Sequence, residues 1–267
     1  SWILYESIEF NFLCLYTFVI NTLEPSWALR TSVMLRKLFK DLSYRFDTSE
    51  VFSDFLDYAI LVMKWQDRNR DFSYFEKKYK DHYDLFQKML DQLSIESNNA
   101  GEGMKDALGD FFMDEISHGR NGQYFTPQPI CDMMALITME TIKDNQLITD
   151  PTCGSGRMLL AAGKLNRKAI FIGSDIDMTC CKMAVINMLL NTMRGEITCM
   201  DALSMEFRKA WQLDYKNIAG HNMPFWVEIN KKEDSFHFMN QEKVAKPEVK
   251  TPIINKQIKP VQLALFQ

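Results

Sequence analysis

The fold is decided by one stretch of sequence, Leu147-Ile-Thr-Asp-Pro-Thr-Cys-Gly-Ser-Gly156. The apolar pair at 147–148 predicts a short strand, and the two glycines predict a tight loop. The apolar spacing that follows predicts a helix over 157–165, whose first N–H groups point toward whatever lies at the loop. Glycine lets the backbone approach a ligand closely. This stretch therefore predicts a ligand-binding loop between a strand and a helix.

Strands and helices alternate around this loop. We expect strands at 147–148, 169–172 and 196–200 and helices at 129–142, 157–165 and 178–193. Strands separated by helices are typical of a doubly wound, mostly parallel sheet with right-handed crossovers. The predicted fold class is therefore α/β with a Rossmann-like sheet.

The segments on either side of this sheet differ in character. Helical spacing predicts helices over 49–64, with Ser49 as N-cap, and over 74–93 and 103–117. After about residue 241 the chain is polar and punctuated by proline, which predicts a flexible tail. We therefore expect an all-helical N-terminal domain over 1–118, an α/β domain over 119–240 and a tail over 241–267.

Composition limits the classes of partner. The 267 residues carry a net charge of −4, so binding to nucleic acid would need a local patch or a partner protein. One basic cluster is either such a patch or an ordinary solvated face, and it contains Arg30, Arg36, Lys37, Lys40 and Arg45. The six cysteines form no C-x-x-C pair, which predicts buried thiols, no metal site and a cytoplasmic protein. The apolar segment 10–20 is too short to span a membrane and predicts a buried or partner-facing helix.

An acidic residue ends each predicted strand, at Asp150, Asp175 and Asp201. Asp175 follows the loop by about twenty residues, where an acid accepts hydrogen bonds from ribose hydroxyls. Asp201 would then reach an adenine amino group, although a strand-end Asp is often only a helix cap. Leu159 stands where a dinucleotide fingerprint needs a third glycine, which favours a ligand with a compact carboxylate end over a pyrophosphate.

Four segments carry a resemblance to a known family: Gly122-Gln-Tyr-Phe-Thr-Pro127, Asp150 to Gly156, Gly173-Ser-Asp-Ile-Asp177, and Asp201 with Ala202. On these, residues 119–225 resemble the adenine-N6 DNA methyltransferases, in particular the modification subunits of type I restriction systems and their relatives on mobile elements. The resemblance implies S-adenosyl-L-methionine as cofactor. It implies cofactor contacts from Tyr124, Phe125, Thr126, Asp150, Thr152, Gly154, Ser155, Gly156, Asp175, Ile176, Asp201 and Ala202.

The family's catalytic motif, Asn-Pro-Pro followed by an aromatic residue, has one candidate here, Asn222-Met223-Pro224-Phe225. The resemblance implies that Asn222 and the carbonyl of Met223 hold the target amine while Phe225 stacks on a flipped base. Methionine replaces the first proline, and the preceding segment 215–221 is a poor buried strand, so a structural turn is the alternative. The residues after Phe225 leave room for a hairpin, 226–230 with 235–239, but not for a target-recognition domain.

The segment Gln262-Leu-Ala-Leu-Phe266 resembles the short peptide with which bacterial proteins dock on the sliding clamp. The alternative is an apolar end that packs on its own domain. Three functions stay open at this point. The chain methylates the exocyclic amine of adenine in DNA, or it is a catalytically silent, cofactor-binding accessory subunit docked on a DNA-bound partner, or it methylates RNA or a protein glutamine.

Overall fold

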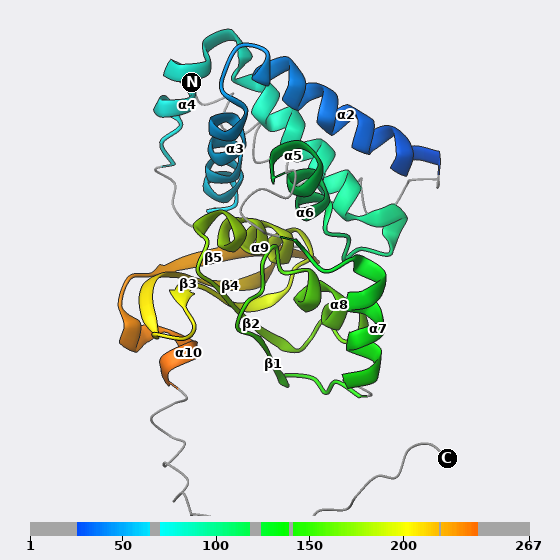
Figure 1. The fold of residues 1–267 in the computed structure, drawn as a ribbon, viewed down its shortest axis with the longest axis vertical. Helices are drawn as coiled ribbons and strands as arrows, with labels where there is room; N and C mark the ends of the chain where they lie inside the picture. Colours follow the sequence, from blue (N-terminus) through cyan, green and yellow to red (C-terminus); the bar gives the residue numbers. More distant parts are fainter. Residues whose placement is uncertain (1–25, 65–69, 118–123, 139–140, 219, 240–267) are drawn as a thin grey trace, which may run out of the picture.

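The computed structural model describes residues 26–64, 70–117, 124–138, 141–218 and 220–239. Helices occupy the first part of this chain and a five-stranded sheet the second (Figure 1). The helices of the first part are α2 (Ser26–Ser43), α3 (Thr48–Val62), α4 (Ser73–Tyr79), η1 (Lys80–His82), α5 (Asp84–Ser97), η2 (Asn99–Gly101), α6 (Ala107–Phe111) and η3 (Phe112–Ser117).

The second part contains α7 (Gln128–Thr138), β1 (Leu147–Asp150), α8 (Arg157–Leu165), β2 (Ile170–Asp175), α9 (Met178–Leu190), β3 (Arg194–Asp201), β4 (Glu206–Ile218), β5 (His221–Ile229), η5 (Lys232–Asp234) and α10 (Phe236–Met239). The strands lie in the order β1-β2-β3-β4-β5. The pairs β1–β2 and β2–β3 are parallel, whereas β3–β4 and β4–β5 are antiparallel.

The predicted α/β class is confirmed, but the prediction of a mostly parallel sheet is wrong. Only residues 202–205 separate β3 from β4, and a parallel return needs a crossover of about a dozen residues or more. The chain therefore turns back in hairpins, and the sheet is mixed. The crossovers from β1 to β2 and from β2 to β3 both move toward the same side of the sheet. Two right-handed crossovers of this kind put α8 and α9 side by side on one face, whereas a doubly wound sheet carries helices on both faces.

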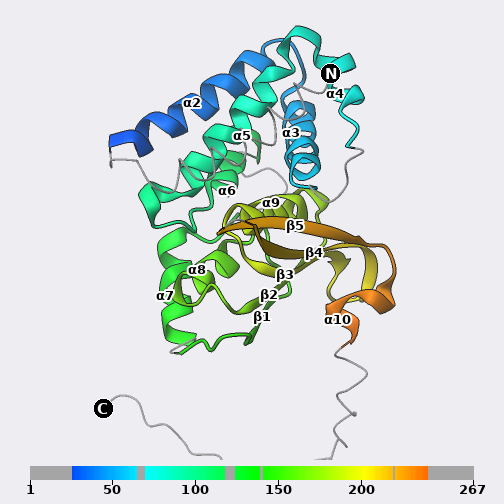
Figure 2. The same cartoon turned by 180° about the vertical axis from the view of Figure 1, so that it is seen from behind.

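Three layers stack on one another, from the helices α2–α6 through α9 to the sheet (Figures 1 and 2). A single cluster of buried apolar side chains runs through them, from Phe39 and Phe55 to Ile186 and Trp211. The indole Nε1 of Trp226 in β5 donates a 2.8 Å hydrogen bond to the carbonyl of Ile60 in α3. The helical part and the sheet thus share one core, and the domain boundaries at 118 and 240 stay predictions.

Some predicted elements differ from those observed. The N-cap of α3 is Asp47, whose carboxylate accepts the N–H of Glu50 at 3.0 Å, and not Ser49. The helix expected over 74–93 is divided at Lys80, which has a positive φ of 44°. The hairpin expected over 226–230 and 235–239 is wrong, because the first segment belongs to β5 and the second is largely α10. The strand β4 was expected only over 215–221, as a poor buried strand, whereas it begins at Glu206.

Other expectations are tested only in part. The five described cysteines are buried free thiols, as expected: Cys131, Cys153, Cys180, Cys181 and Cys199. Within the described ranges, no helix combines the length and the apolar character needed to cross a membrane. The apolar segment 10–20, the tail 241–267 and the clamp-like peptide Gln262 to Phe266 lie outside the described residues.

Candidate functional site

Three acidic side chains stand at the carboxyl edge of the parallel strands. Asp150 ends β1 opposite Gly173, and Asp175 ends β2 opposite Cys199. Asp201 ends β3 two residues further along the same edge. Open α/β sheets bind their ligands at this edge. The structure therefore brings together the three strand ends that the sequence singled out.

The loop after β1 is fastened to the end of β2 by hydrogen bonds. The N–H of Gly154 donates to Oδ2 of Asp175 at 2.9 Å, and the N–H of Cys153 donates to the carbonyl of Ser174 at 2.8 Å. The other oxygen of Asp175 accepts the N–H of Asp177 at 2.9 Å. A carboxylate has about four acceptor positions, so Asp175 fixes the loop and keeps capacity for a ligand's hydroxyl groups.

Two glycines give the loop its path. Gly154 and Gly156 have positive φ angles of 54° and 84°. A Cβ on Gly154 would lie 3.1 Å from the ring of Phe125, and one on Gly156 would lie 3.2 Å from Cβ of Ala184. Gly156 is also the N-cap of α8 and offers no capping side chain, so the first N–H groups of α8 remain donors for an anionic group.

The segment 124–126 lies against this loop. The ring of Phe125 stacks on Phe112, with centroids 5.8 Å apart, and borders Gly154. The carbonyl of Thr126 accepts a 3.2 Å hydrogen bond from Nη1 of Arg157 at the start of α8. Tyr124 is 74% exposed, so its ring is available to cover a ligand. Phe125 and Thr126 thus lie beside the glycine loop, and the cofactor contacts expected of this segment stay a prediction.

Beyond Asp175, the edge carries an exposed apolar side chain, Ile176, and the acid Asp201. Ile176 is 54% exposed although it is aliphatic. Asp201 accepts the backbone N–H groups of Leu203 at 2.8 Å and Ser204 at 3.3 Å, and these hydrogen bonds lower the pKa of its carboxyl group. Asp201 therefore caps the β3–β4 turn, whereas the alternative interpretation expected it to cap a helix, and it still lies next to Ala202 at the sheet edge.

Asp150 differs from the other two acids. Burial raises the pKa of its carboxyl group above the ordinary value, with the negative charge of Asp175 adding to the effect, while the N–H of Thr152 opposes it through a 3.1 Å hydrogen bond. The charged form of Asp150 is therefore poorly solvated in the folded protein. A nearby positive group on a ligand would favour the ionised form.

The side chain of Ser155 is buried and hydrogen-bonded within the protein. Its hydroxyl group donates a 2.5 Å hydrogen bond to Oδ2 of Asp106, and the residue is only 1% exposed. The Ser155 side chain is therefore turned away from the edge toward the helical layer. Any contact between Ser155 and a ligand would come from its backbone.

Asp106 is the centre of a buried polar network that the sequence analysis missed. Besides the hydrogen bond from Ser155, its carboxylate accepts hydrogen bonds from Nε of Arg157 at 2.8 Å, Nδ2 of Asn187 at 2.7 Å and the backbone N–H of Gly109 at 2.8 Å. The sequence signal for it is Arg157 itself, because a positive charge in the first turn of a helix opposes the helix dipole and calls for an acidic partner. The network joins the helical layer to the glycine loop.

The tetrapeptide Asn222-Met-Pro-Phe225 lies far from this edge, in β5. Leu213 of β4 is opposite Gly195 near the start of β3, and Asn217 of β4 is opposite Asn222. At about 3.3 Å per residue, Asn222 is on the order of 30 Å along the strands from Asp201. The side-chain oxygen of Asn222 accepts a 3.0 Å hydrogen bond from Asn217. The structure therefore does not bring Asn222, Met223 and Phe225 to the edge where the target amine would have to be held, and these residues lie in a strand instead of the structural turn given as the alternative.

The described residues contain no cluster of metal-ligating side chains, and acidic residues lie beside part of the basic cluster. Across the described parts of the chain, no group of three or more His, Cys, Asp or Glu residues could hold a metal ion. In the basic cluster, Arg36 forms ion pairs with Asp114 at 2.7 Å and Glu115 at 2.9 Å, and Lys40 lies 3.6 Å from Glu115. These acids offset the positive charge, which favours the interpretation of a solvated face.

Comparisons with known proteins match this region. A family model described as N-6 DNA Methylase matches residues 104–254. The MpnII methylase subunit of a type I restriction enzyme from Mycoplasma pneumoniae is 30% identical over 134 residues, which are 44% of this chain and 24% of that protein. This chain thus matches about a quarter of the relative's length. Among solved structures, the methyltransferase subunit of a type I restriction-modification system from Streptococcus thermophilus matches with 20% sequence identity and a TM-score of 0.32. The match covers 60% of this chain and 37% of that chain.

Proposed function

Since this chain belongs to the N-6 DNA methylase family, we propose that it binds S-adenosyl-L-methionine at the carboxyl edge of β1, β2 and β3 and serves methylation of adenine in DNA. The observation that carries the proposal is the junction of Gly154 with Asp175, because it presents a glycine-lined backbone and a carboxylate with spare acceptor capacity at one place.

The residues at this edge fit the parts of that cofactor. The glycine loop and the first N–H groups of α8 suit its carboxylate, Asp175 suits its ribose hydroxyls, and exposed Ile176 suits the face of its adenine. Tyr124 would cover the methionine end of the cofactor, and the Asp201 carboxylate would accept a hydrogen bond from the adenine amino group. The cofactor itself supplies a methyl group on a sulfonium centre, and the protein's part is to orient it and to exclude water.

The target amine needs its own binding groups close to the methyl group. Because Asn222 to Phe225 lie at the opposite edge, we propose that other groups hold the amine, either in parts of the chain outside the described residues or on a partner. The same observation favours a second candidate, in which this chain binds the cofactor as an accessory subunit and a partner carries the DNA contacts. Docking through Gln262 to Phe266 on a sliding clamp would be one such arrangement.

The test is transfer of a labelled methyl group from S-adenosylmethionine into unmethylated bacterial DNA, read by nucleoside mass spectrometry, alongside calorimetric cofactor binding. Labelled N6-methyladenine that is lost in Asp175→Ala and kept in Asp144→Ala would support the enzyme. Asp144 is a suitable control because it is an exposed acid that precedes β1, at the amino edge. Cofactor binding without transfer would favour the accessory subunit, and failure to bind the cofactor would overturn both candidates.

A further inference from the structure

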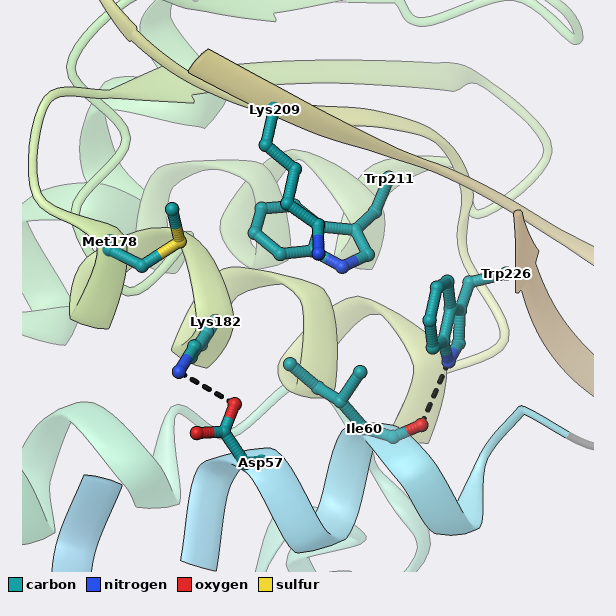
Figure 3. Close-up of a pocket in the computed structure, with 7 residues that line it drawn as sticks. All are labelled: Asp57, Ile60, Met178, Lys182, Lys209, Trp211 and Trp226. Carbon is teal, nitrogen blue, oxygen red and sulfur yellow. Dashed lines mark hydrogen bonds and ion pairs between the residues drawn. The ribbon is translucent and has the colours of Figure 1, made fainter. Parts of the chain in front are cut away.

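A pocket of about 300 Å³ lies between α3, α9, β4 and β5, and its lining contains none of the loop residues or strand-end acids described above (Figure 3). Ile60 and Met178 form its aliphatic wall, and the indoles of Trp211 and Trp226 form its aromatic wall. Three charged side chains complete it, Asp57, Lys182 and Lys209. Its size is at the lower limit of the range of small-molecule sites, which begins at roughly 300 Å³.

The aromatic wall is held in place by the packing of the two layers. Trp211 is only 2% exposed, and the Nε1 of Trp226 is committed to the carbonyl of Ile60 at 2.8 Å. The ammonium group of Lys209 lies 5.1 Å from the centroid of the Trp211 ring. The ammonium group of Lys64 likewise lies 5.4 Å from the centroid of the Trp226 ring. Indoles stack on nucleobases without regard to base identity, so a base that enters this pocket would take the place of these ammonium groups on the ring faces.

The cations are positioned at the same pocket and have donors to spare. Lys182 forms a 2.6 Å ion pair with Asp57, and Lys209 lies 3.2 Å from Glu228. Asp57 and Glu228 offset the charges of the two lysines, but an ammonium group has three N–H donors, so one ion pair leaves each lysine donors for an incoming anion. The Lys182 side chain is only 17% exposed, which strengthens its interaction with an anion relative to a fully solvated lysine.

We propose that this pocket binds a nucleotide, with its base against Trp211 and Trp226 and its phosphate between Lys182 and Lys209. A stacking surface beside two cations matches the two chemical parts of a nucleoside 5′-phosphate, whereas an apolar ligand would leave the lysines unused. The nucleotide is either free or one unit of a single DNA strand. The proposal does not depend on methyl transfer or on the cofactor site.

Fluorescence titration of the full chain tests it, with thymidine 5′-monophosphate, single-stranded oligothymidylate and a DNA duplex as probes. Saturating S-adenosylhomocysteine is present to prevent the nucleotide from binding at the proposed cofactor site. Quenching of tryptophan fluorescence is expected, and Lys182→Gln and Lys209→Gln should each weaken binding by about tenfold. Lys164→Gln is the matched control, because Lys164 also forms an ion pair, with Asp132 at 2.7 Å, but lies on α8. Circular dichroism verifies that each variant is folded.

The outcomes separate the possible sources. Tighter binding of oligothymidylate than of either the monophosphate or the duplex would identify a single strand as the ligand, and equal binding of monophosphate and oligothymidylate would identify a free nucleotide. If neither the monophosphate nor oligothymidylate quenched the fluorescence at millimolar concentration, the proposal would be overturned. Binding that is unchanged in the Lys182→Gln, Lys209→Gln double variant would also overturn it, even if the protein binds cofactor and methylates DNA.

Discussion

The backbone N–H of Gly154 donates a 2.9 Å hydrogen bond to the Asp175 carboxylate, which joins the loop after β1 to the end of β2. Gly154 can approach so closely because it has no side chain and has a positive φ of 54°. The acid that we expect to hold the cofactor's ribose therefore also fixes the loop expected to hold its methionine end. The two halves of the proposed site are coupled through a single side chain.

Replacing this acid should weaken cofactor binding. In Asp175→Ala the Gly154 and Asp177 N–H groups lose their acceptor, and the proposed contact with the ribose is removed. We expect cofactor affinity to fall by about 1–3 kcal/mol, or roughly fivefold to 150-fold, by isothermal titration calorimetry. Asp144→Ala, at an exposed acid before β1, should leave the affinity unchanged. Equal affinities for wild type and Asp175→Ala would remove Asp175 from the site.

Asp150 should make stability depend on pH in a direction opposite to that of most carboxylates. Burial raises the pKa of Asp150 above its ordinary value of 3.8, so the folded state holds the proton more strongly than the unfolded state. Its contribution to stability is therefore complete below pH 3.8 and is lost as the pH rises through the raised pKa.

The measurement for Asp150 is urea denaturation of Asp150→Asn at several pH values. The variant should exceed wild type in free energy of unfolding at neutral pH, and the difference should shrink on acidification. Asp144→Asn is the control of opposite sign, because a hydrogen bond from Asn166 lowers the pKa of Asp144. A wild type that is the more stable protein at neutral pH would contradict the burial argument.

The sequence predicts the first three strands and the loop well, and it does so for a local reason. A strand, a glycine turn and an amphipathic helix are each encoded within about ten residues, so the start of α8 at Arg157 and of α9 at Met178 agree with expectation. Strand ends then fall on one edge by the rule for parallel crossovers. Asp150, Asp175 and Asp201 are predictable for that reason.

The second half of the sheet is only partly predictable, because the pairing of its strands depends on residues that are distant in the chain. The segment of β4 does alternate, with Phe207, Trp211 and Leu213 among polar residues, and this pattern could have predicted a half-buried strand. Nothing local reveals that β4 pairs antiparallel with β3. The role of Asp106 is even harder to predict from the sequence, because its partners Arg157 and Asn187 lie 51 and 81 residues away in the chain.

Substitution of Asn222 should have little effect on the cofactor. Its side chain contacts Asn217 at 3.0 Å on the exposed turn between β4 and β5, at the edge opposite the loop. Asn222→Ala should change stability by no more than about 0.5 kcal/mol and leave calorimetric cofactor affinity as in wild type. Loss of cofactor affinity in a folded Asn222→Ala variant would show that the motif reaches the cofactor after all.

Asp106 should matter to both stability and the cofactor, because it connects the helical layer to the glycine loop. Asp106→Asn removes the charge that faces Arg157 and leaves a buried cation with one acidic partner, Asp110, at 2.7 Å. Loss of one member of a buried pair costs about 3 kcal/mol, measured by chemical denaturation, and cofactor affinity should fall with it as Ser155 loses its acceptor. Asp110→Asn is the matched control, since the Asp110 side chain is 48% exposed and its ion pair should contribute less than about 1 kcal/mol. If the two variants lost equal stability and both kept full cofactor affinity, Asp106 would be a structural acid with no part in positioning the loop.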